Sequence, residues 1–109
     1  MSWDAAHAEA ETRWTVEDLC RSSPELKTLR GQPITLELQF SADGGAPERV
    51  IRAFKMFGYA AEDLGDEGVQ VAVPDTGFDA DDIWHHEERT AQIALANGYR
   101  PDGWGFFEP

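Results

Sequence analysis

Apolar and polar residues alternate most regularly in the segment that starts at Ile34. The apolar residues are Ile34, Leu36, Leu38 and Phe40, and the polar residues between them are Thr35, Glu37, Gln39 and Ser41. A period of two is typical of a strand that buries one face. The pattern therefore predicts a strand here, followed by a turn at residues 42–45.

The next segment changes to the spacing of a helix. Apolar side chains recur three or four residues apart, at Pro47, Val50, Ile51, Phe54 and Phe57. This spacing places them on one helical face, and the following Gly58 is a typical residue to end a helix. We predict a helix over residues 46–58.

A hairpin is predicted after this helix. Residues 59–64 and 69–73 flank a turn at residues 65–68, which reads Gly-Asp-Glu-Gly. The second segment alternates valine with other residues, as a half-buried strand does. We interpret residues 74–78, which contain proline, aspartate and glycine, as a loop.

The last two elements complete a regular order. Asp79, with Asp82 three residues later, resembles a helix cap and predicts a helix over residues 79–97. Residues 99–107 are aromatic and interrupted by glycine, as a closing or edge strand can be. The order strand, helix, strand, strand, helix, strand predicts an α+β ferredoxin-like (βαββαβ) fold, with a four-stranded antiparallel sheet and both helices on one face.

Residues 1–30 give weaker signals, and we treat them as an extension of the domain at residues 31–109. Thr15 predicts the cap of one short helix, and Ser23 before Pro24 predicts the cap of another. A further helix is an alternative to a frayed terminus. Its docking stripe would be Trp3, Ala6, Ala10 and Trp14. The sequence thus predicts a short helical or partly disordered extension.

The charge of the chain restricts its partners. The 109 residues, enough for one domain, include 21 acidic and 9 basic side chains, for a formal net charge of −12. Such a charge opposes approach to phosphate backbones and to anionic membranes. We expect no direct nucleic-acid partner and no membrane partner, and we expect a basic protein segment to be attracted.

The chain shows no signal for export or for redox chemistry. Residues 1–4 lack the basic and apolar regions of a secretory signal, and no segment reaches the roughly 18 apolar residues of a membrane span. We therefore expect a cytoplasmic protein. The single cysteine, Cys20, cannot form an internal disulfide, and its neighbours include no histidine to activate it.

The densest group of potential ligands lies at positions 85–88, which read His-His-Glu-Glu. Consecutive residues of a helix point about 100° apart, so they cannot converge on one ion. The pairs Asp81 with His85 and Asp82 with His86 have ligand spacing, and solvent-facing charge pairs explain them equally well. We predict no catalytic, cofactor-binding or metal-binding residues.

Glu87 is unusual within this group because it falls in an otherwise apolar helical stripe. The other members of the stripe are Ala80, Ile83, Ala91 and Ala94. One interpretation is a desolvated carboxyl group with a raised pKa, as in many catalytic acids. The other, which we favour, is that Glu87 reaches water or Arg100 at the end of the sheet.

The segment at residues 102–108 is the most distinctive in the chain. Glycines flank Trp104, so the indole either packs across the neighbouring strand as part of the core or stays available as a binding anchor. Acidic residues occur in this segment and in the hairpin. The candidate protein-contact residues are Glu62, Asp63, Asp66, Glu67, Asp102, Trp104 and Glu108.

Several short motifs occur in a fixed order along the chain. They are Phe40-Ser41-Ala42-Asp43, Ala53-Phe54-Lys55, Gly58-Tyr59, Asp79-Ala80-Asp81, Asp102-Gly103-Trp104-Gly105 and Glu108-Pro109. In this order, and with an acidic hairpin between them, they resemble the regulator B family of ribonuclease E inhibitors over about residues 34–109.

This resemblance implies a ferredoxin-like domain that binds ribonuclease E, interferes with its assembly or activity, and so changes the abundance of many transcripts. It implies no catalysis. We therefore expect a non-catalytic acidic regulator whose partner is ribonuclease E or a similar basic protein segment. The alternative is a generic interaction domain, or a ligand- or metal-binding domain with Glu87, His85 or His86 in a concave site.

Overall fold

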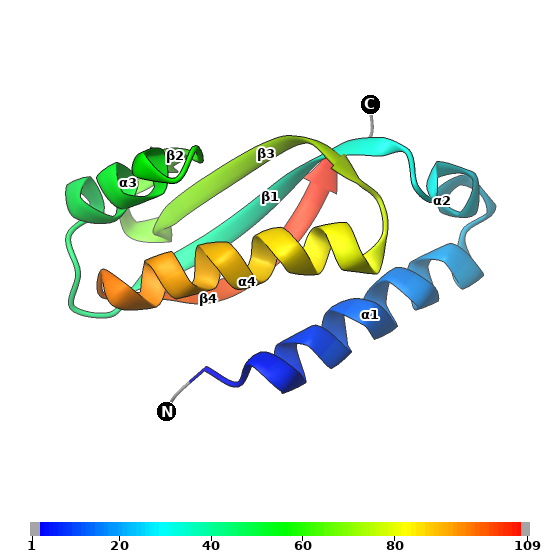
Figure 1. The fold of residues 1–109 in the computed structure, drawn as a ribbon, viewed down its shortest axis with the longest axis horizontal. Coiled ribbons are helices and arrows are strands. Elements are labelled where there is room, and N and C mark those ends of the chain that lie inside the picture. Colours follow the sequence, from blue (N-terminus) through cyan, green and yellow to red (C-terminus); the bar gives the residue numbers. More distant parts are fainter. Residues whose placement is uncertain (1–2, 108–109) are drawn as a thin grey trace.

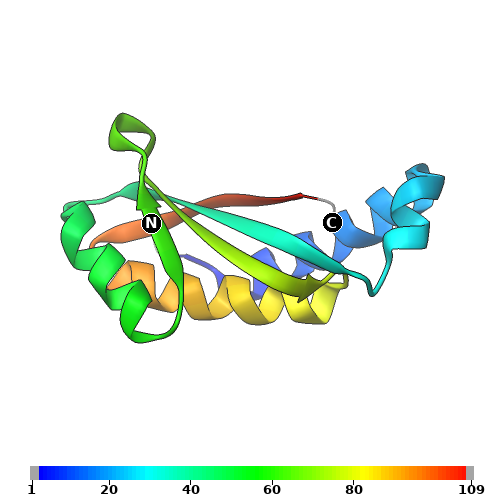
Figure 2. The ribbon, with the colours of Figure 1, turned by 90° about the horizontal axis from the view of Figure 1, so that it is seen from above.

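The computed structural model describes residues 3–107. The chain forms an α+β domain in which four strands make one antiparallel sheet, in the order β2-β3-β1-β4. Helices α3 and α4 lie on one face of this sheet, and α1 runs beside α4 (Figure 1 and Figure 2). The elements are α1 (Ala5–Ser22), α2 (Pro24–Leu29), β1 (Pro33–Ala42), α3 (Pro47–Met56), β2 (Ala60–Asp63), η1 (Gly65–Glu67), β3 (Val69–Gly77), α4 (Ala80–Ala96) and β4 (Tyr99–Phe107).

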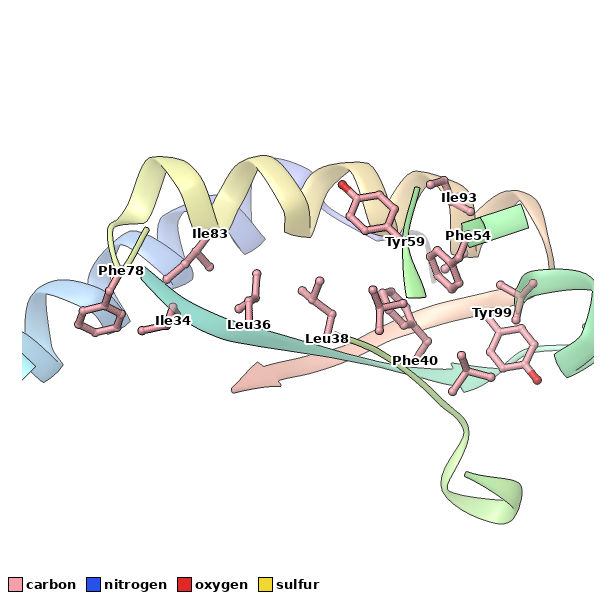
Figure 3. Packing of buried hydrophobic residues seen from close by; sticks show 14 of the residues in the cluster. Ile34, Leu36, Leu38, Phe40, Phe54, Tyr59, Phe78, Ile83, Ile93 and Tyr99 are labelled. Carbon is pink, nitrogen blue, oxygen red and sulfur yellow. The ribbon is translucent and has the colours of Figure 1, made fainter. Parts of the chain in front are cut away.

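Strand β1 is central in the sheet and confirms the alternation seen in the sequence. It pairs with β3 on one side and β4 on the other. Its apolar residues are buried beneath α4 and α3 (Figure 3). The intervening polar residues therefore point to the opposite face, which no helix of the described chain covers.

Helix α3 confirms the second prediction, with a shorter buried stripe. Val50 and Phe54 are fully buried, whereas the side chain of Phe57 is 57% exposed. The helix ends at Met56, and Gly58 adopts a φ of 85°, which lets the chain turn sharply into β2. The predicted stripe therefore extends one residue too far.

The predicted loop at residues 74–78 is wrong, because β3 continues to Gly77. The partner of Ile34 is Thr76, but the partner of Leu36 is Val73, so β3 carries an extra residue opposite β1. Such a bulge accommodates proline and an unusual backbone conformation inside a strand. Asp75 accordingly has a φ of 58°. Residues that are typical of a turn thus form an irregularity within the ladder.

Strand β4 is the predicted closing strand and forms one edge of the sheet. Trp104 lies opposite Leu38, and Pro101 lies opposite Phe40, so β4 also contains a bulge. Gly103, with a φ of 103°, lies in this bulge. Because β2 forms the other edge, β4 and the hairpin lie at opposite edges of the sheet.

Helix α4 begins as its capping residues predict. The Asp79 carboxylate accepts a hydrogen bond of 2.8 Å from the backbone N–H of Asp82. Ile83, Ala91 and Ala94 are fully buried against the sheet. The helix over residues 79–97 is confirmed to within one residue at each end.

The N-terminal segment is more regular than predicted. Helix α1 is a single helix of 18 residues capped by Asp4, so Thr15 lies inside a helix and does not cap one. Its buried residues are Thr12, Val16 and Cys20, whereas Trp14 is 64% exposed. The proposed docking stripe is therefore wrong. The helix is amphipathic, but a polar residue belongs to its buried face.

Helix α2 confirms the second N-terminal prediction. The Ser23 hydroxyl accepts a hydrogen bond from the backbone N–H of Leu26, and Pro24 begins the helix. Val16 and Cys20 of α1 belong to the same core as the sheet. Within residues 3–107, none of the helices combines the length and apolar character that crossing a membrane requires.

Candidate functional site

The acidic hairpin stands away from the body of the molecule. Glu62 and Asp63 end β2, and Asp66 and Glu67 lie in η1; all four are exposed. The Asp63 carboxylate accepts a hydrogen bond of 2.9 Å from the backbone N–H of Gly65, which stabilises the turn. Both Figure 2 and Figure 3 show the turn projecting from the sheet on the side away from α4.

The sheet face turned away from the helices is polar and joins the hairpin. The side chain of Gln70 donates a hydrogen bond of 2.8 Å to the Glu37 carboxylate across neighbouring strands. Ser41 donates one of 2.8 Å to Asp102, which places Asp102 on this face. These bonds hold acidic groups in fixed positions on an open surface.

Charge is distributed unevenly between the sheet and the helices. We call six carboxylates the acidic sheet side: Glu37, Glu62, Asp63, Asp66, Glu67 and Asp102. Asp75 in β3 is the seventh acidic residue of the strands and η1. Arg100 is the one basic residue in these described elements. The other basic residues lie on helices or at their ends. The strands and η1 therefore carry acidic residues with little basic compensation, whereas the helices and their ends carry residues of both signs.

Trp104 lies apart from these acidic residues. It faces the helical layer, packs against the core, and is partly buried. Its indole N–H donates a hydrogen bond of 3.2 Å to the Thr12 hydroxyl of α1. The structure thus brings Asp102 together with the hairpin side but does not bring Trp104 onto that surface. The remaining candidate, Glu108, lies outside the described residues.

Glu87 contacts α1, and no hydrogen bond or ion pair joins it to Arg100 in the described chain; its side chain is partly buried and lines an open groove. The Thr12 hydroxyl donates a hydrogen bond of 2.5 Å to the Glu87 carboxylate. Thr12 therefore links Trp104 of β4 to Glu87 of α4. Burial raises the pKa of Glu87, the hydrogen bond from Thr12 lowers it, and the charge of Glu11 raises it; the net effect is a raised pKa.

A groove of about 810 Å³ lies beside this chain of hydrogen bonds, between α1 and β4. Trp3, Trp104 and Phe106 supply aromatic surface, and Glu11 and Glu87 supply carboxylates. The sequence indicated Glu87 through its place in an apolar stripe. Thr12 carried no comparable signal, because a threonine inside a helix is ordinarily solvent-facing.

The two consecutive histidines take different environments. His86 forms a hydrogen bond of 3.0 Å between its Nδ1 and the Tyr59 hydroxyl, whereas His85 is exposed. Burial, and then the neighbouring His85, lower the pKa of His86. Among residues 3–107, histidine, cysteine, aspartate and glutamate form no group of three or more placed to hold a metal ion.

Sequence comparisons found no protein-family model and no curated protein that matches the chain. What the protein does is therefore inferred from where its charges and its cavities lie. The acidic sheet side and the groove between α1 and β4 are the two features that a function must explain.

The raised pKa of Glu87 predicts a specific pH dependence of stability. Because the folded state holds this proton more tightly than the unfolded state, the stabilisation is complete below the ordinary pKa of 4.5 and is lost as the pH rises through the folded pKa. Glu87→Gln, which cannot ionise, should therefore be more stable than the parent at neutral pH and equal to it in acid. Urea unfolding across this pH range measures the difference.

The adjacent Glu88, which does not line the groove, provides the matched control. Glu88→Gln should lack the gain in stability at neutral pH that is expected of Glu87→Gln. Parallel stability curves for Glu87→Gln and the parent would show that Glu87 is solvated and that its pKa is not raised.

Proposed function

We propose that this protein is a non-catalytic, acidic protein-binding regulator whose partner is a basic segment of ribonuclease E or of a similar basic protein. The observation that carries the proposal is the acidic sheet side. It contains six carboxylates, and the strands and η1 contain one basic residue, Arg100. A field of this sign attracts a cationic peptide and opposes nucleic acid and anionic membranes.

The proposal includes a ferredoxin-like fold. Two features support it: the order β1-α3-β2-β3-α4-β4, and the position of α3 and α4 on one face of the antiparallel sheet. This arrangement leaves the other face free for a partner. The resemblance to the regulator B family over residues 34–109 supports ribonuclease E as the target, and a cytoplasmic location belongs to the same proposal.

The contact surface in this proposal is the hairpin together with Asp102. Exposed charges at the rim of an interface act mainly on the rate of association, because they steer the partner before contact. Their effect decreases as salt shortens the range of the field. Rate constants measured at two salt concentrations are therefore the sharpest test.

Neutralising the turn with Asp66→Asn and Glu67→Gln should slow association with immobilised ribonuclease E by about 3- to 10-fold at low salt. The dissociation rate should change little, and the dependence of association on salt should become flatter. Surface plasmon resonance at low and at physiological ionic strength measures all three quantities.

A double variant on the helical side, Asp18→Asn with Glu25→Gln, removes the same charge and is the matched control. It should slow association much less. Equal effects of the two double variants on the association rate would mean that the rate depends on net charge alone and that the hairpin is not the contact surface. Undetectable binding of the unmutated protein at low salt would overturn ribonuclease E as the partner.

A further inference from the structure

The groove between α1 and β4 faces away from the acidic sheet side and is not used by the function proposed above. Its volume of about 810 Å³ is within the range of small-molecule sites in proteins, roughly 300–1,000 Å³. Helix α1 forms one wall, β4 forms the other, and Glu87 of α4 reaches in between them. The groove therefore has the dimensions of a ligand site.

The aromatic wall of the groove is held in place by contacts with neighbouring side chains. Trp104 is held by its N–H bond to Thr12 and by its packing against the core, and the rest of its side chain lines the groove. Phe106 lies next to it, with ring centroids 6.5 Å apart. At the other end, Trp3 stacks on Trp84 with centroids 6.0 Å apart. Such fixed aromatic surfaces bind apolar groups and attract cations over their faces.

The charged groups of the groove are unbalanced. Asp4, Glu11 and Glu87 line it, whereas no lysine or arginine of the described chain does. The carboxylate of Glu11 lies 2.8 Å from Nε2 of His7, and this pair is well exposed at the rim. Asp4 caps α1 through its bond with the backbone N–H of His7.

Among the three carboxylates that line the groove, Glu87 is the one whose pKa is raised by burial. It is more than half buried, and Thr12 is its one hydrogen-bond donor among the described side chains. A carboxylate withdrawn from water without a cation is costly, and Glu11 adds repulsion of like charge. A cation in the groove would relieve both effects, whereas an anion would add repulsion and a neutral apolar molecule would remove water from Glu87 without compensating its charge.

We propose that this groove binds a small organic cation, an ammonium or guanidinium group carried on an apolar body. The charged group would lie near Glu87 and Glu11, and the apolar body would pack along Trp104 and Phe106. This is a second binding function, on a different side of the molecule from the proposed contact with a basic protein segment.

Titration of the full chain with 2-phenylethylammonium, followed by calorimetry at neutral pH, tests the proposal. Its neutral isostere 2-phenylethanol and the anion 3-phenylpropionate are the matched probes. We expect the ammonium to bind about tenfold or more tightly than the alcohol, because only the cation compensates Glu87, and the anion not to bind. Equal affinities of the ammonium and the alcohol would overturn the proposal.

Variants locate the site. Glu87→Gln should weaken binding of 2-phenylethylammonium about tenfold, and Glu88→Gln on the same helix should leave it unchanged. Since Glu87→Gln is expected to be at least as stable as the parent at neutral pH, loss of binding would not reflect unfolding. No loss in Glu87→Gln would overturn the site, as would binding of arginine-containing peptides without binding of the free cation.

Binding of the cation in the groove is expected to be independent of partner binding on the acidic sheet side. Asp66→Asn with Glu67→Gln should bind 2-phenylethylammonium as the parent does, and Glu87→Gln should associate with ribonuclease E at the parent rate. The indole N–H resonance of Trp104 should shift on titration with the cation, which places the ligand beside β4. An unshifted Trp104 resonance would contradict this placement.

Discussion

Replacing Phe54 by alanine is expected to lower the free energy of unfolding by about 3 to 5 kcal/mol. Phe54 is fully buried, and its ring packs on Phe40 of β1 with centroids 5.2 Å apart (Figure 3). Truncation removes the apolar contacts of the ring and leaves a cavity between α3 and the sheet, which surrounding side chains fill only in part. A domain of this size has about 5 to 15 kcal/mol of stability, so the loss is a large fraction.

Urea unfolding of Phe54→Ala and of the parent measures this loss. The matched control is Phe57→Ala, three residues further along, because Phe57 is 57% exposed. The control should change stability by less than about 1 kcal/mol. A loss of that small size in Phe54→Ala would contradict the packing of α3 on β1.

Replacing Trp104 by alanine should lower the free energy of unfolding by about 2 to 4 kcal/mol. Trp104 is only partly buried, so its contribution from packing is less than that of a core tryptophan. It also donates the hydrogen bond to Thr12, and this bond joins β4 to α1. The substitution therefore weakens both the core and the attachment of the N-terminal helix.

Trp14→Ala is the matched control for Trp104→Ala, since Trp14 is 64% exposed on the outer side of α1. It should alter stability by about 0.5 kcal/mol or less. Trp104→Phe should fall between the two, because it keeps an aromatic ring and loses the N–H donor. If Trp104→Ala kept the parent stability and lost binding to ribonuclease E, Trp104 would be an exposed anchor for the partner, contrary to its contact with Thr12.

Sequence patterns predict correctly the elements whose buried face follows from the spacing of their own apolar residues. The residues of β1 alternate with a period of two, and the apolar residues of α3 and α4 recur at helical spacing. In each case one element contributes one apolar face to a shared core, so local periodicity contains the needed information. The caps at Ser23 and Asp79 are equally local, since their bonds close within three residues.

The features that were missed depend on partners distant in the sequence. Thr12 and Glu87 are 75 residues apart, and their hydrogen bond is what makes a polar residue suitable for the buried face of α1. An apolar pattern does not indicate such a face, so the sequence predicts the wrong roles for Thr15 and Trp14. The bulge in β3 is similar, because it exists only in relation to the register of β1.

The sequence by itself determined the sheet-forming strand β1, the two amphipathic helices α3 and α4, and the net charge of −12. Only the tertiary structure decided where that charge acts. Strand pairing gathers carboxylates on the face without helices, while the docking of α1 encloses Glu87 beside Trp104. The physical reason is that composition sets the total charge, whereas the field and the desolvation of each carboxylate depend on neighbours that folding brings together.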